Sequence, residues 1–522
     1  MSNEVLQVPV ERELDALFGQ YTAAGQARGL VYGITDADGL FHTAGFGAAD
    51  ELGRVPDADT VFPIASMTKS FTACAALAAR DRGLLSLHEP ITKYVPEFSL
   101  SAGHVDVPTL EMLLGMYGGL TEDNSWVDPF INMPTDSLLA LVEKGVRFSH
   151  LPGAVYEYSN LGFTLASLAV SRAAGRPLGD FLRQEVLLPL GLNSTYCDNA
   201  VPDGVTRAVG YSLDTEGNWV PYPPQASDAF LGAGGLVSTV RDLAAWITWL
   251  GAAFRPAQTS QASRTGDDRV LSRASRRDLQ RIRVLAPPAL SLNDGGTVRT
   301  AQGGYALGLQ VTTDLQRGTL ISHGGGLPGF SLYMTWHPGS GYGAVVLTNS
   351  HRGNPAALCG EALGRLLSRR QAPASTITLW PETAELRGKA EELIRRWDDG
   401  LAAGIFAENI DFDRPLAQRR EEIARLTAAV GPLLDSPTLS VVSAASAADI
   451  TWSIPAERGE LLCMIHLTPV NPARIQELVV KAVPADRPRS AAPVDISPRR
   501  RLGEAYLAPG ANVRVQFPEP GQ

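Results

Sequence analysis

A serine and a lysine stand three residues apart where a short apolar run gives way to a predicted helix. They are Ser66 and Lys69, in a segment that begins at Phe62. Residues three apart on a helix share one face, about a turn from each other. The serine would occupy the first turn, where unpaired backbone N–H groups and the helix dipole favour negative charge. This placement suits a nucleophile and the oxyanion that its attack creates.

The lysine of this pair can act as a base. Held close to the serine and partly withdrawn from water, Lys69 would lose its proton near neutral pH and accept one from the Ser66 hydroxyl. The spacing S-x-x-K is a motif of serine acyl-transfer enzymes. A pattern with two fixed positions also arises by chance, and the alternative is an ordinary helix start with a surface lysine. Other parts of the chain have to decide between them.

Tyr158 and Asn160 form a second constellation. They follow a Pro-Gly turn and precede an apolar run, Leu161 to Val170, which predicts a buried helix. Both side chains would lie on the loop that enters this helix, a rigid support for exposed polar groups. A tyrosine beside a lysine can act as general base or relay a proton to the leaving group. The asparagine amide can hydrogen-bond the lysine and a substrate carbonyl. The alternative is a plain turn in which Ser159 or Asn160 caps the helix.

A histidine followed by three glycines is the third constellation. His323 opens it, and an alternating apolar pattern from Leu332 to Leu347 predicts a hairpin after it. Glycines such as Gly325 and Gly326 at a strand edge let a ligand backbone approach closely. A flexible loop with a solvated histidine is the alternative. A phosphate-binding loop is disfavoured, because its lysine pattern and its following helix are absent from the sequence.

In this order, the three constellations resemble those of the penicillin-recognising serine hydrolases, which include class C β-lactamases, DD-peptidases, family VIII carboxylesterases and D-aminopeptidases. Their pattern is S-x-x-K, then Y-x-N, then K-T-G or H-x-G on a strand. The resemblance covers roughly residues 10–370 and implies an α+β, β-lactamase/transpeptidase-like fold, with an antiparallel sheet flanked by helices and a helical subdomain. The matching positions are Ser66, Lys69, Tyr158, Asn160, His323 and Gly325.

The resemblance also implies a mechanism. Ser66 attacks a carbonyl while Lys69, with Tyr158, removes the serine proton. Two backbone N–H groups hold the oxyanion, those of Ser66 and of a residue near Gly326, and one such donor contributes about 2.7–4 kcal/mol. Tyr158 then passes a proton to the leaving group. The predicted catalytic residues are thus Ser66, Lys69 and Tyr158, and the predicted substrate-binding or oxyanion residues are Asn160, His323, Gly325 and Gly326.

The third constellation departs from the lactamases and DD-peptidases, which carry lysine where this chain has His323. Histidine has an unperturbed pKa of about 6.5, so a penicillin-type carboxylate would be held weakly at neutral pH. The resemblance then favours a D-aminopeptidase- or esterase-like hydrolase of small amides, peptides or esters. An acyltransferase or peptide cyclase that uses the same acyl-serine is a second candidate, and a non-catalytic binder is a third. Met116 and Tyr117, where relatives are polar, predict an altered substrate cleft.

Charge and motifs exclude several kinds of partner. A formal net charge of −10 argues against nucleic acids and anionic membranes, so we expect a small-molecule or peptide substrate. No apolar run approaches the roughly 18 residues of a membrane-spanning helix. The segment Met1–Leu6 lacks the basic start and apolar core of a signal peptide, which predicts a cytoplasmic protein. The other histidines show no metal-ligand spacing, so neither a metal nor another cofactor is expected.

The length of 522 residues predicts more than one domain. We assign residues 1–370 to the hydrolase domain, 371–375 to a linker, and 376–522 to a small α+β accessory domain. Two amphipathic helices, Thr383–Ala403 and Gln418–Val430, lead it, and short strand-like runs follow. This order fits an NTF2-like fold at least as well as a lipocalin-like barrel. No catalytic set lies in this domain, so it would shape the cleft or an oligomer interface.

Two further predictions concern the last part of the accessory domain. Asp486–Arg501, rich in proline and arginine, is predicted to be disordered, and Val513–Phe517 to form a strand.

Overall fold

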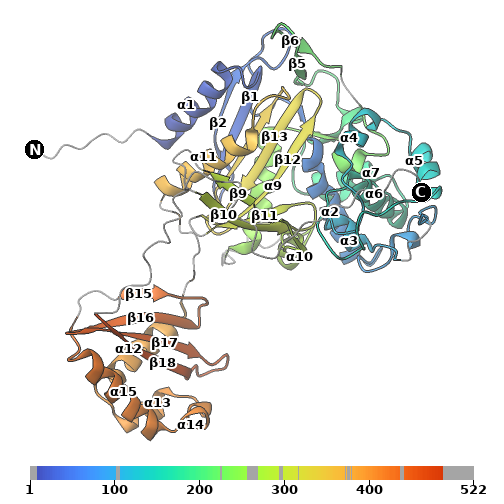
Figure 1. Ribbon diagram of the computed structural model, residues 1–522. Coiled ribbons are helices and arrows are strands. Elements are labelled where there is room, and N and C mark those ends of the chain that lie inside the picture. Colours follow the sequence, from blue (N-terminus) through green and yellow to red (C-terminus); the bar gives the residue numbers. More distant parts are fainter. Residues whose placement is uncertain are drawn as a thin grey trace, which may run out of the picture. The chain divides into compact units, whose positions relative to one another are not determined.

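Two compact units, Met1–Ser375 and Thr376–Gln522, make up the chain in the computed structural model (Figure 1). The two predictions for Asp486–Arg501 and Val513–Phe517 lie outside the described residues. The structure describes residues 9–101, 106–223, 226–255, 268–287, 289–292, 298–314, 317–370, 372, 377, 379–435 and 440–485.

An antiparallel sheet forms the centre of the first unit and takes strands from both ends of that unit. Strand β1 (Gly29–Thr35) pairs with β14 (Gly343–Thr348), so strands from the two ends of the unit lie side by side in the sheet. The strand order is β2-β1-β14-β13-β12-β11-β10-β8, with β9 paired to β10. The other strands are β2 (Leu40–Gly47), β8 (Val284–Leu285), β9 (Ala289–Leu292), β10 (Val298–Tyr305), β11 (Gln310–Asp314), β12 (Gly318–Leu327) and β13 (Phe330–Trp336).

Helices cover both faces of this sheet. On one face lie α1 (Val10–Ala23) and α11 (Pro355–Arg369), which contact each other and the strands beneath them. On the other lies α9 (Val240–Gly251), packed against β1, β13 and β14. Helix α1 buries Phe18, whose ring stacks on Tyr32 of β1 with centroids 3.8 Å apart. Burying one such side chain stabilises the fold by about 1.5–3 kcal/mol.

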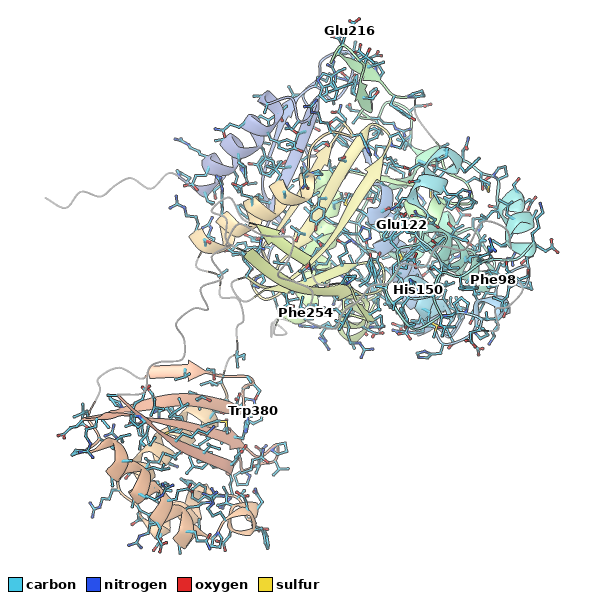
Figure 2. All side chains as sticks on the ribbon, viewed as in Figure 1. Phe98, Glu122, His150, Glu216, Phe254 and Trp380 are labelled. Atoms are coloured by element: carbon cyan, nitrogen blue, oxygen red, sulfur yellow. The ribbon has the colours of Figure 1, made fainter. Side chains whose placement is uncertain are left out.

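A helical subdomain is inserted between the strands (Figure 1). At its centre α2 (Thr68–Asp81) packs against α6 (Asn160–Ala174). Small residues along α2 let neighbouring elements approach closely, and α2 is buried from Thr68 to Ala79. Glu122 and His150 lie on the exposed surface of this subdomain (Figure 2). Its other helices and short strands are β3 (Phe62–Pro63), α3 (Leu110–Leu114), α4 (Asn124–Val127), α5 (Thr135–Glu143), α7 (Leu178–Leu182), β4 (Tyr196–Cys197), α8 (Leu231–Gly234) and β7 (Leu236–Ser238). The hairpin of β5 (Tyr211–Leu213) and β6 (Trp219–Pro221) lies apart from these helices, near the central sheet, where Tyr211 pairs with Ser350 (Figure 1).

The second unit has its own sheet and its own core. Four antiparallel strands follow one another in the order β15-β16-β17-β18, and helices pack on one face around the buried Trp452 (Figure 1). The strands described for residues 440–485 form an open sheet and close no barrel. The elements are α12 (Pro381–Arg395), α13 (Asp399–Ile405), α14 (Asn409–Asp413), α15 (Leu416–Val430), β15 (Ser440–Ser443), β16 (Asp449–Ala456), β17 (Gly459–Leu467) and β18 (Ile475–Pro484).

Among the helices in the described part of the chain, none combines the length and apolarity needed to cross a lipid bilayer.

Candidate active site

Ser66 lies in a single 3-10 turn, η1 (Ala65–Met67), directly before α2. The residue before it, Ala65, has a φ of 48°. This left-handed conformation is rare for a residue with a Cβ and costs on the order of 1–3 kcal/mol. Strand β12 packs against this turn and helps to hold it. The strained backbone therefore places the serine side chain at the junction of the sheet and the helical subdomain.

Gly325 allows this close packing of strand on turn. A Cβ at this position would lie 2.5 Å from the Ile64 carbonyl oxygen and 3.3 Å from the Ala65 Cβ. Since a backbone oxygen cannot move aside as a flexible side chain can, a larger residue has to push the Ser66 turn away from β12. This glycine thus lets the strand pack closely against the turn that carries Ser66.

We expect Gly325→Ala to lower kcat/KM at least about tenfold and to destabilise the fold by about 1–3 kcal/mol, the usual cost of overpacking. Steady-state kinetics and a thermal melt measure the two effects. Gly360→Ala on α11 is the matched control, because the added methyl group meets no atom of the described residues within 4 Å beyond its own helix backbone and chain neighbours. If Gly325→Ala behaved like that control, the strand would not be holding the turn.

Lys69 is fully buried, and its amine touches three oxygens. Nζ lies 2.7 Å from Asn160 Oδ1, 2.7 Å from the Ala233 carbonyl oxygen and 3.0 Å from Ser66 Oγ. Two of these are carbonyl oxygens, which can only accept. A neutral amine has two N–H groups and one lone pair. The carbonyls take the two N–H groups, and the lone pair then faces the serine hydroxyl.

Burial lowers the pKa of Lys69 to about 7, although the nearby Asp123 carboxylate opposes the shift. At neutral pH a large part of the amine is therefore uncharged. Together with the lone pair facing Ser66, this is the arrangement that a general base needs.

Tyr158 lies next to Lys69 and Ser66. Its ring centroid lies 4.9 Å from Lys69 Nζ. Burial raises the pKa of the phenol above its ordinary value, and the neighbouring Ser66 hydroxyl offsets only part of this rise. The phenol thus stays protonated. Of the two roles considered for it, proton relay fits this environment and phenolate base does not.

Asn160 is the first residue of α6, and Ser159 is its N-cap. The Ser159 Oγ accepts a hydrogen bond of 3.1 Å from the Gly162 N–H. The capping alternative from the sequence is therefore present, but it does not compete with a role in the site. The cap fixes the residue at which α6 begins, and this position places the Asn160 side-chain oxygen next to Lys69.

His323 lies on β12 and is only 2% exposed, so the solvated-loop alternative does not hold. Its Nδ1 donates to the Gly324 carbonyl oxygen at 2.6 Å, which leaves Nε2 to accept from the Tyr305 hydroxyl at 2.9 Å. Burial, with the Lys69 charge, lowers the pKa of the ring to about 3. The third constellation hence presents a neutral imidazole with internal partners on both nitrogens. Gly326, further along β12, is exposed.

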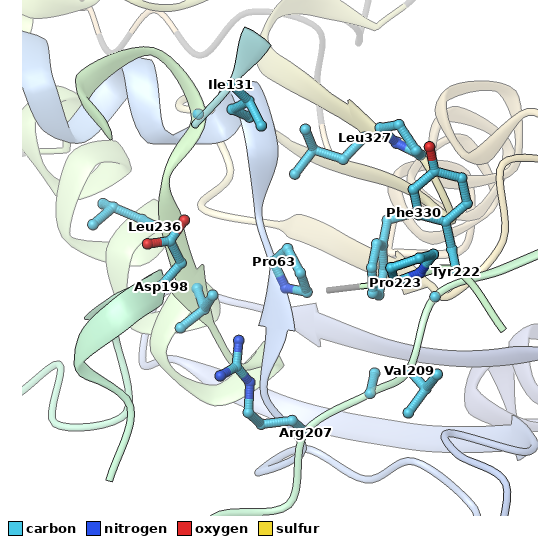
Figure 3. A pocket seen from close by; sticks show the side chains of 15 residues that line it. Pro63, Ile131, Asp198, Arg207, Val209, Tyr222, Pro223, Leu236, Leu327 and Phe330 are labelled. Carbon is cyan, nitrogen blue, oxygen red and sulfur yellow. The ribbon is translucent and has the colours of Figure 1, made fainter. Parts of the chain in front are cut away.

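A cavity of about 270 Å³ lies next to Pro63, three residues before Ser66 (Figure 3). Its lining does not include Ser66, Lys69, Tyr158, Asn160 or His323. Gly234, next to the carbonyl that holds Lys69, lines it, and so does Leu327 at the end of β12. Leu327 and Phe330 lie on one side of the cavity, and the polar Arg207 and Asp198 lie at the opposite end (Figure 3). Most of the residues that line the cavity are apolar. Its polar end has one acidic residue, Asp198, and one basic residue, Arg207.

Three contributors to the site were not singled out in the sequence: Asp123, the Ala233 carbonyl and Tyr305. Ala233 belongs to a glycine-rich stretch that ties back to α2, where Thr72 Oγ1 donates to the Gly232 carbonyl at 2.7 Å. Met116, expected in the cleft, is buried beneath the Tyr158 loop, where its sulfur accepts from the Ser159 N–H. No group of three or more metal-ligating side chains occurs within the described ranges.

Comparison with known proteins identifies the family of the chain. A sequence model of the Beta-lactamase family matches residues 14–366, more than half of the chain. Penicillin-binding protein 4* of Bacillus subtilis (strain 168) is 25% identical over 342 residues, which cover 62% of this chain and 68% of that protein. Protein flp of Staphylococcus aureus (strain N315) is 24% identical over 344 residues, which cover 65% of this chain and 63% of that protein.

Solved structures confirm the predicted fold. An octameric penicillin-binding protein homologue from Pyrococcus abyssi aligns over 90% of this chain and 99% of its own, with a TM-score of 0.59 and 19% identity. A class C β-lactamase from Rhodobacter sphaeroides aligns over 69% of this chain and 99% of its own, with a TM-score of 0.53 and 21% identity. The chain belongs to the Beta-lactamase family, within the superfamily of serine hydrolases to which penicillin-binding proteins and class C β-lactamases also belong.

Proposed function

We propose that this protein hydrolyses small amides, peptides or esters through an acyl group carried on Ser66. The observation that carries the proposal is the bonding of Lys69. Its buried amine gives both N–H groups to carbonyl oxygens and keeps its lone pair 3.0 Å from the serine oxygen. A lysine with a merely structural role would gain nothing from a lowered pKa. Here the loss of charge produces a base at the position where the serine proton leaves.

The steps of the proposed reaction follow from these contacts. Ser66 Oγ attacks the substrate carbonyl carbon, and its proton moves to Lys69 Nζ. The carbonyl oxygen becomes an oxyanion, held by the backbone N–H of Ser66 and by that of a residue near Gly326. When the carbon–leaving-group bond breaks, Tyr158 gives its proton to the leaving group and is reprotonated from Lys69. Water then attacks the acyl-serine, and the same groups carry the protons in reverse.

The site also restricts the substrate. The neutral, internally bonded His323 offers no cation for a substrate carboxylate, so β-lactams and D-Ala-D-Ala peptides lose an anchor that a lysine provides in relatives. The cavity next to Pro63 is lined by apolar groups such as Leu327 and Phe330. We therefore expect preferred substrates to carry an aromatic or branched apolar acyl group and no free carboxylate next to the scissile bond.

A substrate panel tests the proposal. We expect the full chain to cleave p-nitrophenyl esters or p-nitroanilides of D- or L-amino acids with apolar side chains, and to turn over nitrocefin at least about tenfold more slowly. Mass spectrometry after a fluorophosphonate probe should show one adduct, on Ser66. Absence of both turnover and adduct would refute the hydrolase proposal and favour a binder. If an added amine yielded mainly aminolysis product in water, acyl transfer would replace hydrolysis.

We also propose that the protein self-associates through its second unit. In support, the aligned Pyrococcus abyssi homologue is octameric, and its alignment extends over 90% of this chain. Light scattering of the full chain at micromolar concentration measures the mass, and a monomer would contradict the proposal.

A further inference from the structure

Asp123 is a buried carboxylate that none of the steps above uses. Its side chain, on the residue before α4, is 8% exposed. It accepts hydrogen bonds from the start of α6: from the backbone N–H of Asn160 at 2.7 Å and of Leu161 at 2.8 Å, and from Ser159 Oγ at 3.1 Å. Burying a charge is costly unless it is well paired. The contacts show that this charge is directed at one place, the segment that carries Tyr158 and Asn160.

The same carboxylate also holds the Asn160 side chain. Asn160 Nδ2 donates to Asp123 Oδ1 at 3.1 Å and to Asn124 Oδ1 at 2.8 Å. Both hydrogens of the amide are thus taken. If the amide were turned over, its oxygen would face two acceptor oxygens and its NH2 would face Lys69. The amide oxygen therefore has to point at Lys69 Nζ, 2.7 Å away.

We propose that Asp123 is a positioning residue for the Ser66 chemistry: it locks the Asn160 amide so that the amide oxygen takes one Lys69 N–H and the lysine lone pair stays on the serine. The inference rests on the proposed function. Asp123 does not touch the reacting atoms, and it acts through Asn160 and then Lys69. A role as helix cap alone would stabilise α6 without any effect on the lysine.

The proposal has a signature in the pH dependence. The titratable groups that face Lys69 from the packed elements are Asp123 before α4, Tyr158 before α6 and His323 on β12. Of these, Asp123 stabilises the charged amine, which raises the pKa of Lys69. Removing its charge lowers that pKa, and an amide turned toward Lys69 by its NH2 lowers it further. Both effects move the acid limb of the rate profile to lower pH.

The test measures the rate of Ser66 labelling by a fluorophosphonate across pH 5–9 in the full chain. We expect Asp123→Asn to slow labelling at its pH plateau on the order of 10- to 100-fold, which is the loss typically seen when a residue that orients a metal ligand is removed. The acid limb should shift to lower pH. Asp128→Asn, an exposed carboxyl five residues on, is the matched control and should leave rate and limb unchanged. Asn354→Ala removes the N-cap of α11, where the Asn354 side chain accepts from the Ala357 N–H, and should lower the melting temperature without moving the limb.

A double-mutant cycle separates positioning from folding. If Asp123 acts through Asn160, Asp123→Asn should add little to the loss already caused by Asn160→Ala, whereas independent effects would multiply. Multiplying effects, or an unshifted limb in a folded Asp123→Asn protein, would overturn the inference. Should that variant not fold, Asn124→Ala decides, since it removes the other acceptor of the amide: slowed labelling supports the proposal, and unchanged labelling rejects it. No labelling of the wild type would instead refute the proposed function itself.

Discussion

The Ser66→Ala variant is expected to lose at least about three orders of magnitude in kcat/KM toward the best ester or anilide, and to take up no fluorophosphonate. In the proposed mechanism the serine oxygen forms the bond that carries the acyl group, so its removal ends covalent catalysis. The oxyanion donors and the cavity remain in the variant, and they account for the small activity that serine hydrolases keep without the nucleophile. Initial rates and intact-protein mass spectrometry measure the two losses.

The control for this variant is another serine-to-alanine change outside the site. Ser171 lies near the other end of α6, and its Oγ donates within the helix, to the Ser167 carbonyl. We expect Ser171→Ala to keep both activity and labelling. Labelling of Ser66→Ala at another residue, or turnover within tenfold of wild type, would show that the nucleophile is elsewhere.

The parts of the site that could be predicted from the sequence are those whose chemistry is local. Ser66 and Lys69 are three residues apart, so their contact follows from helix geometry alone. Tyr158 and Asn160 lie at the start of a helix, and the turn before it and the apolar run after it predict where that helix begins. For the same reason the helix predicted over Leu161 to Val170 is present as the central part of α6.

Contacts between distant segments could not be predicted in this way. Asp123 reaches Asn160 across 37 positions, and the Ala233 carbonyl reaches Lys69 across 164. A carbonyl oxygen leaves no mark in a sequence, because every residue carries one. Tyr305 meets His323 since β10 and β12 lie on either side of β11, a pairing that no short pattern encodes. These are tertiary relations, and the packing of the sheet against the helical subdomain sets them.

In the second unit, one continuous amphipathic pattern in the sequence corresponds to two separate helices in the structure. The charged amphipathic run predicts one helix from Thr383 to Ala403, but the structure has two, because the backbone of Arg396 is extended and Asp398 caps a new helix. Asp398 Oδ1 accepts from the Leu401 N–H at 2.7 Å. A capping residue inside a periodic run competes with helix continuation, and here the cap prevails.

Replacing Lys69 by methionine is expected to lower kcat/KM about 10²- to 10⁴-fold, the range for loss of a general base, and to remove the acid limb of the pH profile. Methionine retains the length and much of the volume of the side chain in the buried site. In the wild type the base works only when uncharged. Since the pKa of Lys69 is lowered to about 7, the rate should rise as the pH passes upward through 7 and then level off.

The environment of the site assigns this limb to Lys69. The pKa of His323 is lowered to about 3 by burial and by the Lys69 charge, and that of Tyr158 is raised by burial, so neither group titrates near pH 7. Lys93→Met is the matched control, because Lys93 is exposed and pairs with Glu89 on the surface. Its profile should equal that of the wild type. A limb near pH 7 that persisted in Lys69→Met would mean that another group accepts the serine proton, whatever the lysine contributes to the rate.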